Sequence, residues 1–248
     1  MEKNPSQLIV IGSGYSLKEG IEKGLWSTLK DRFTLGINFI YRDFTPTALC
    51  CIDNTFYQEG CTNFLPEQTE IHKNTIKTLP LIINRYKKTA PVFPNTIGLK
   101  HSSVYCRDLS CGCYNDVLAG LFTLSLGIYL LDIGEIFLLG YDFGPSEGKD
   151  GQGRALTHYN QDKFTHRGTG RTEWYLNPLK EKFKHEVLFA PYETETQVKI
   201  YNVSLNSRIS IFPKINYQEF FQRLTPEIHN QDILRQYIKE KLRDKHVK

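Results

Sequence analysis

The chain has 248 residues, of which 40% are hydrophobic and 23% charged, and its formal net charge is +4 at pH 7. This composition predicts a globular chain with a sizeable core, and so small a net charge argues against nucleic acid as the main partner. No stretch approaches the roughly 20 apolar residues of a membrane span, and MEKNPSQ lacks the apolar segment of a signal peptide. We therefore expect a cytoplasmic protein without a membrane span, and leave a homo-oligomer open.

Four short apolar segments in the first part of the chain are predicted strands, because each ends at polar or glycine-containing residues. They span residues 7–12, 33–38, 47–53 and 79–84. The first leads into the turn Gly12-Ser13-Gly14. A helix is predicted to follow it, because Ser16 and Glu19 have the spacing of a capping box.

The second half of the chain contains the strongest apolar pattern. Residues 115–134 predict a buried helix, opened by Asn115 or Asp116 and closed by Gly134, and a strand is predicted directly after it. The later predicted elements are a strand at 135–143, a glycine-rich, charged interruption at 144–171, a helix at 174–185, strands at 186–191 and 199–204, and an amphipathic helix from about Pro226.

Strands that alternate with helices predict an α/β fold with parallel pairing. We expect a single Rossmann-like domain over residues 1–225, with a mostly parallel sheet and helices on both faces. The interruption at 144–171 is long enough to be a lid loop. Residues 226–248 are predicted to form a basic C-terminal amphipathic helix.

The turn after the first strand has two interpretations. Glycines suit a close approach of the backbone to a phosphate, which the N–H groups of Gly14 to Leu17 would hold at the start of a helix. A tight strand-to-helix turn without a ligand explains the same pattern. A nicotinamide or flavin site is disfavoured, because Leu17 replaces the third glycine of that fingerprint and the second strand ends in Asn38 instead of an acid.

Polar residues follow several predicted strands. In an open parallel sheet, ligands bind beyond the carboxyl ends of the strands. Asn38 could bond a ribose or a base, and acids there could bond ribose hydroxyls, although each is also a common cap or turn residue. The strand ends carry Gly12, Ser13, Gly14, Asn38, Asp53, Asn54 and Asp142.

The predicted lid contains His158, His166, Arg167 and Arg171. A histidine near its ordinary pKa of about 6.5 suits a general base for an acceptor hydroxyl. Arginines suit the stabilisation of a phosphate leaving group without a metal. We predict that His166 is the base and that His158 orients or binds phosphate, and that Arg167 and Arg171 contact phosphate. The alternative is a surface loop whose histidines take no part.

Six cysteines are present, and without a signal peptide we expect reduced thiols. Cys106, Cys111 and Cys113 lie near His101, but they make one incomplete zinc knuckle. Unpaired thiols are therefore favoured over a structural metal site.

Several short motifs resemble two related groups of proteins: bacterial lipooligosaccharide sialyltransferases, and motility-accessory and hydroxymethylpterin pyrophosphokinase-like proteins. GSGYSL resembles their G-x-G-x-S-L opening, and GINFIYRDFTPTALCCID resembles their second and third strands. NDVLAGLFTLSLGIYLLDIGEIFLLGYDFG resembles their helix, strand and aspartate. THYN and His166 resemble the histidine loop of the sialyltransferases, and IYNVSLNSRI resembles their late P-N-S segment. The resemblance covers most of residues 8–210.

This resemblance implies a transferase with a nucleotide-activated donor, most simply a CMP- or UDP-linked sugar, and a glycan or modified-base acceptor. It implies that the base is His158 or His166. The sialyltransferases carry a tyrosine where this chain has Gly144, so Tyr159 or Tyr175 would replace it or the donor differs. The donor-binding residues implied are Gly12, Gly14, Ser16, Asn38 and Asn54, with Asn206 and Ser207 lining the nucleotide.

Two alternatives stay open. The first is an ATP-dependent pyrophosphokinase of the hydroxymethylpterin type, which needs Mg²⁺; Asp53, Asp142 and Asp162 are candidate ligands for that ion. The second is a non-catalytic binding subunit that keeps the fold, an interpretation supported by the basic tail. For the glycosyltransferase itself we predict no metal, because the chain lacks a D-x-D motif.

Overall fold

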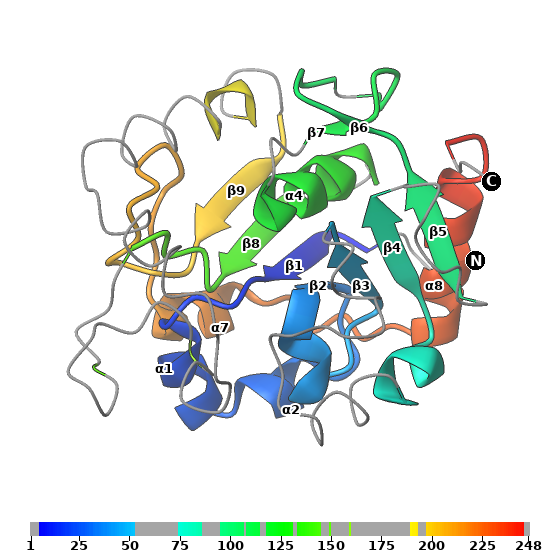
Figure 1. The fold of residues 1–248 in the computed structure, drawn as a ribbon. Helices are drawn as coiled ribbons and strands as arrows, with labels where there is room; N and C mark the ends of the chain where they lie inside the picture. Colours follow the sequence, from blue (N-terminus) through cyan, green and yellow to red (C-terminus); the bar gives the residue numbers. More distant parts are fainter. Residues whose placement is uncertain are drawn as a thin grey trace.

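A computed structural model describes residues 5–52, 74–85, 95–106, 108–114, 118–130, 133–144, 149, 159, 189–192 and 197–245. Figure 1 shows its strands and helices, which are mixed along the chain. The strands are β1 (Gln7–Ile11), β2 (Thr34–Ile37), β3 (Ala48–Cys51), β4 (Ile82–Arg85), β5 (Thr96–Leu99), β6 (His101–Ser102), β7 (Cys113–Tyr114), β8 (Glu135–Leu139) and β9 (Lys199–Asn202). The labelled helices are α1 (Leu17–Glu22), α2 (Leu25–Leu29), η1 (Asn38–Arg42), α4 (Ala119–Tyr129), α7 (Tyr217–Arg223) and α8 (Gln231–Lys241), and residues 74–78 are helical as well.

The main sheet has seven strands in the order β5-β4-β3-β2-β1-β8-β9, and every pairing is parallel. The chain first builds outward from β1 to β5. It then returns to the other side of β1, where β8 pairs with it along its whole length. The order therefore reverses between β1 and β8, which is where open α/β sheets bind ligands. The predicted α/β class and parallel sheet are confirmed.

Both faces of β1 are buried, because its side chains alternate between two cores. Leu8 and Val10 pack with the apolar side of α4, whereas Ile9 and Ile11 pack with Leu17 of α1 and with residues of α2 and α7. Figure 1 shows α4 on one side of the sheet and α1, α2 and α7 on the other. The prediction of helices on both faces is therefore confirmed.

The main predicted helix is α4, and it is shorter at its carboxyl end than the apolar pattern indicated. It ends at Tyr129. Gly134 does not close it, because the Gly134 N–H donates to Ser6 O at 2.8 Å, at the entry to β8. Asn115 and Asp116, the predicted openers, lie outside the described residues.

The predicted C-terminal amphipathic helix is α8. Asn230 caps it by accepting hydrogen bonds from the N–H groups of Asp232 and Ile233. Its apolar side, with Leu234 and Ile238, is buried in the same core as β1 and α4. This packing makes α8 part of the same compact structure as the main sheet.

One predicted strand is wrong. Residues 189–192, the described end of the segment predicted as the strand 186–191, are helical, and Phe189 and Tyr192 are buried there. A short apolar segment cannot be distinguished from a buried helical turn by its pattern alone. The predicted helix at 174–185 lies outside the described residues.

Gly20 provides a test of the packing of α1 on α7, because a Cβ there would overlap the Tyr217 ring. In an open helix, a change from Gly to Ala stabilises by about 1 kcal/mol. We expect Gly20→Ala instead to lower the free energy of unfolding by about 1–3 kcal/mol through overpacking, measured by urea unfolding. Gly134→Ala is the control, since its Cβ would meet nothing closer than Ser6 O at 3.6 Å. A Gly20→Ala protein as stable as the wild type would contradict this packing.

Candidate functional site

The turn after β1 lies directly against the turn after β8. The Gly12 N–H donates to Leu139 O at 2.7 Å, and the Gly14 N–H donates to Gly140 O at 2.9 Å. A Cβ on Gly12 or Gly14 would lie 2.7 or 2.6 Å from Gly140 O, closer than non-bonded atoms allow. Only glycine therefore fits at positions 12 and 14, because the carbonyl of Gly140 occupies the space that a side chain would need.

A carboxylate completes this contact. Asp142 Oδ2 accepts from the Ser16 N–H at 2.7 Å, and Oδ1 accepts from the Ser16 hydroxyl at 2.5 Å. Asp142 is buried, and both oxygens of its carboxyl group are bonded to Ser16. The predicted capping box of Ser16 and Glu19 is wrong, because the Ser16 side chain makes no cap bond within its own helix.

Few N–H groups of this turn are open to a phosphate. Of the four from Gly14 to Leu17, those of Gly14 and Ser16 donate to the β8 turn, and that of Leu17 donates to Gly14 O at 3.2 Å. Of these four N–H groups, that of Tyr15 is the one for which no described residue provides the acceptor. As folded, the turn binds protein atoms where the sequence predicted phosphate oxygens.

Asn38 is the most unusual polar residue at this edge of the sheet. It follows β2 with φ of +51°, a left-handed conformation that asparagine tolerates better than most residues. Its Oδ1 is buried, and among the described residues it has no hydrogen-bond partner. A buried acceptor without a donor costs about 1–3 kcal/mol. A bound ligand that donates a hydrogen bond would compensate this acceptor.

The end of β9 supports the same loops. Asn202 Nδ2 donates to Tyr141 O at 3.2 Å and to Ser207 Oγ at 2.9 Å, and the Ser207 hydroxyl donates to Tyr141 O at 2.6 Å. Both side chains are buried. Ser207 therefore holds the β8 turn in this structure, whereas the neighbouring Asn206 is exposed. Sequence reasoning missed Asn202, because this residue lies inside the predicted strand 199–204 and not at its end.

Tyr159 attaches the long interruption to this edge. Its N–H donates to Ser13 O at 3.1 Å, and its hydroxyl donates to Asp43 Oδ2 at 2.7 Å, just beyond η1. Its hydroxyl is thus engaged with a carboxylate. Other predicted site residues lie outside the described residues: His158, His166, Arg167, Arg171, Asp53, Asn54 and Tyr175.

Arg208 is a second residue that the sequence did not single out. Its N–H donates to Asp142 O at 2.8 Å. Its side chain lies across Gly144, where an added Cβ would be 2.8 Å from Arg208 Nε. The absence of a side chain at position 144 therefore makes room for a guanidinium beside the Asp142 turn.

The cysteines differ from the prediction. Cys106 and Cys111 form a disulfide, so the expected reduced thiols are wrong for this pair. Cys50 and Cys113 are buried thiols, and burial raises the pKa of Cys50 to about 12. In the described part of the chain, no three His, Cys, Asp or Glu side chains gather as metal ligands. No helix among the described residues is long and apolar enough to cross a membrane.

The hydrogen bonds of Asp142 can be tested without a ligand. Asp142→Asn removes the charge and one of the two acceptors of Ser16. We expect the free energy of unfolding to fall by about 1–3 kcal/mol. The control is Asp31→Asn, an exposed position where about 0.5 kcal/mol or less is expected. Equal stability of the two variants in urea unfolding would contradict the role assigned to Asp142.

Comparison with known proteins gives a likeness of fold. No protein-family model and no curated protein matches the chain. Among solved structures, it is similar to the MAf glycosyltransferase from Magnetospirillum magneticum AMB-1, with a TM-score of 0.54 and 14% sequence identity. The match covers 97% of this chain but 37% of that one, so this chain spans well under half the length of its structural neighbour. At this identity the two proteins share a Rossmann-like α/β fold.

Proposed function

We propose that this chain is a glycosyltransferase-like enzyme that binds a nucleotide-activated sugar at the carboxyl edge of the sheet. The observation that carries the proposal is the orphaned Oδ1 of Asn38, next to the point where the strand order reverses. A ribose hydroxyl or a base amino group would supply the missing donor. The fold likeness to a MAf glycosyltransferase supports the same class of function.

The predicted donor-binding residues divide into two roles under this proposal. Ser13, Asn38 and the exposed Asn206 contact the donor, together with Asp53 and Asn54 after β3. The second group positions the loops, because its backbone and side-chain atoms are already bonded to neighbouring turns: Gly12, Gly14, Ser16, Asp142 and Ser207.

The proposed chemistry is a single group transfer. An acceptor hydroxyl attacks the anomeric carbon of the donor, and the bond from that carbon to the phosphate oxygen breaks. His166 takes the hydroxyl proton, and His158 orients the phosphate. Arg167 and Arg171 stabilise the charge on the leaving phosphate. Arg208 is added to this group because its guanidinium lies beside the Asp142 turn.

The donor and the acceptor are proposed by class. The donor is a CMP- or UDP-linked sugar, and the acceptor is a glycan or a modified base. A thermal-shift panel of CMP, UDP and ATP, with and without Mg²⁺, tests this assignment. Stabilisation by CMP or UDP without metal supports it. Stabilisation by ATP only with Mg²⁺ favours a pyrophosphokinase, and no stabilisation by any nucleotide favours a non-catalytic binding subunit.

The role of Asn38 is tested by removing its amide without straining the backbone. Asn38→Gly keeps the left-handed conformation accessible. We expect it to weaken binding of CMP or UDP by about 1–3 kcal/mol, roughly 5- to 150-fold, measured by calorimetric titration. Its free energy of unfolding should not fall, because an unsatisfied acceptor is removed. Wild-type affinity in Asn38→Gly would exclude a donor contact at this residue.

The histidines are separated by their effects on binding and on turnover. We expect His166→Ala to retain donor affinity and to lose about 10²- to 10⁴-fold in turnover. We expect His158→Ala to weaken donor binding as well. The measurement is turnover and donor affinity for each variant between pH 5 and 9. Normal turnover in both variants would show that neither histidine takes part in catalysis.

A further inference from the structure

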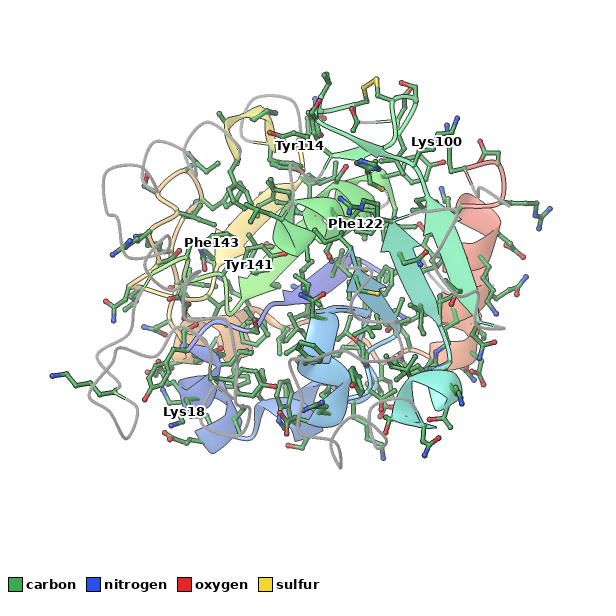
Figure 2. The ribbon with its side chains drawn as sticks, viewed as in Figure 1. Lys18, Lys100, Tyr114, Phe122, Tyr141 and Phe143 are labelled. Carbon is green, nitrogen blue, oxygen red and sulfur yellow. A yellow bond between two sulfur atoms is a disulfide. The ribbon has the colours of Figure 1, made fainter. Side chains whose placement is uncertain are left out.

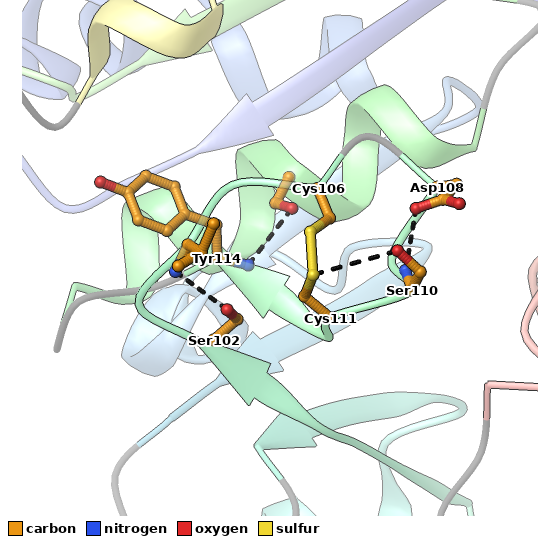
Figure 3. The surroundings of a disulfide bond; sticks show 8 residues. Ser102, Cys106, Asp108, Ser110, Cys111 and Tyr114 are labelled. Atoms are coloured by element: carbon orange, nitrogen blue, oxygen red, sulfur yellow. Dashed lines mark hydrogen bonds between the residues drawn. A yellow bond between two sulfur atoms is a disulfide. The ribbon is translucent and has the colours of Figure 1, made fainter.

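The Cys106–Cys111 disulfide closes a very short loop at the molecular surface (Figure 3). The disulfide loop comprises Cys106 and residues 108–112. Cys111 is exposed and Cys106 is half-buried, so a small thiol can reach the bond. A disulfide that links residues only five positions apart constrains the unfolded chain less than a bond between distant residues does. Its position therefore suits a bond that is made and broken more than one that holds the fold together.

The loop is held in an unfavourable backbone conformation. Leu109 has φ of +56°, which L side chains rarely adopt, yet it is buried in the main core. Its N–H donates to Cys106 O at 3.2 Å, and its carbonyl accepts from the Gly112 N–H at 2.9 Å. Strain of this kind persists only while the surroundings enforce it. Opening the disulfide removes one constraint and allows Leu109 to leave the core.

Both ends of the loop are joined to aromatic rings. Tyr105 precedes Cys106, and Tyr114 follows Cys113. The ring of Tyr192 lies 4.9 Å from that of Tyr105 and 6.1 Å from that of Tyr114. A displacement of the loop therefore acts directly on a buried ring contact.

These rings continue to the candidate site. Phe189 lies 6.1 Å from Tyr192 and 5.4 Å from Phe143, and Phe143 lies 5.9 Å from Tyr141. Tyr141 and Phe143 flank Asp142, the residue that holds Ser16. Figure 2 labels the two ends of this path, Tyr114 near the disulfide and Tyr141 and Phe143 at the end of β8. We call Tyr105, Tyr114, Tyr192, Phe189, Phe143 and Tyr141 the aromatic chain.

We propose that Cys106 and Cys111 form a reversible thiol–disulfide site, and that its redox state alters the Asp142–Ser16 contact through the aromatic chain. The reaction partner is a dithiol. One of its thiolates attacks the exposed Sγ of Cys111, the S–S bond breaks, and Cys106 leaves as a thiolate that takes up a proton. The second thiol of the partner then resolves the mixed disulfide, releasing Cys111 as a thiol and the partner as its own disulfide.

The test compares the air-oxidised protein with the same protein in dithiothreitol. Alkylation followed by peptide mass mapping reports the thiols, and amide hydrogen exchange reports the structure. We expect Cys106 and Cys111 to be alkylated only after reduction. We expect reduction to speed exchange of the Gly14 and Ser16 amides about tenfold or more, while the amide of Ile238 in α8 is unchanged. No nucleotide is used, so the outcome is independent of the proposed transferase activity.

Matched variants identify the path. In Cys106→Ser/Cys111→Ser, the Gly14 and Ser16 amides should exchange at the rate of the reduced wild type, and dithiothreitol should not change that rate. Tyr192→Leu removes a ring from the aromatic chain and should abolish the response to reduction. Tyr192→Phe keeps the ring and loses only the hydroxyl that donates to Leu121 O, so it should retain the response.

Three results would overturn the proposal. The first is alkylation of both cysteines before reduction. The second is faster exchange restricted to the disulfide loop. The third is an equal acceleration at Gly14, Ser16 and Ile238, which would mean that reduction loosens the whole domain without selecting the candidate site.

Discussion

The candidate site depends on one contact, between the backbone of the Gly12–Gly14 turn and the carbonyl of Gly140. No side chain fits between the two turns, because an added Cβ on either glycine would overlap the Gly140 carbonyl. Asp142 then fixes this contact by accepting two hydrogen bonds from Ser16. Since β1 and β8 are neighbours at the point where the strand order reverses, the contact brings together loops from both halves of the sheet.

The same contact changes how the glycine motif is understood. A G-x-G turn after a strand indicates a close approach to something, and here the partner in contact is another backbone. The polar atoms left for a ligand therefore lie outside this contact. Asn38 Oδ1 is the clearest of them, because burial without a donor is unfavourable unless something else compensates. Tyr159 is held at the same edge of the sheet by hydrogen bonds to Ser13 and Asp43.

Apolar segments predicted the sheet well, because buried parallel strands require continuous apolar side chains. β1, β2, β3, β4 and β8 lie within the predicted segments or within one residue of them. Local patterns failed where distant residues compete: Ser16 has the sequence of a capping box but bonds to a carboxylate 126 positions away. The helical residues 189–192 and the Cys106–Cys111 disulfide were missed for the same kind of reason. Both depend on tertiary packing and spatial proximity, which a local sequence pattern does not indicate. The polar strand ends correctly indicated one edge of the sheet, but not which of their atoms are already bonded within the chain.

The most direct measurement is chemical-shift mapping of nucleotides on the ¹⁵N-labelled protein. We predict that CMP or UDP shifts the amides of Tyr15 and Asn38 first, followed by Gly14 and Gly140, because Asn38 carries the orphaned acceptor and the other three residues belong to the paired turns. Saturable shifts confined to the groove lined by Lys23, Gln218, Phe221 and Gln222 would contradict a nucleotide site at the carboxyl edge, and so would the absence of any shift.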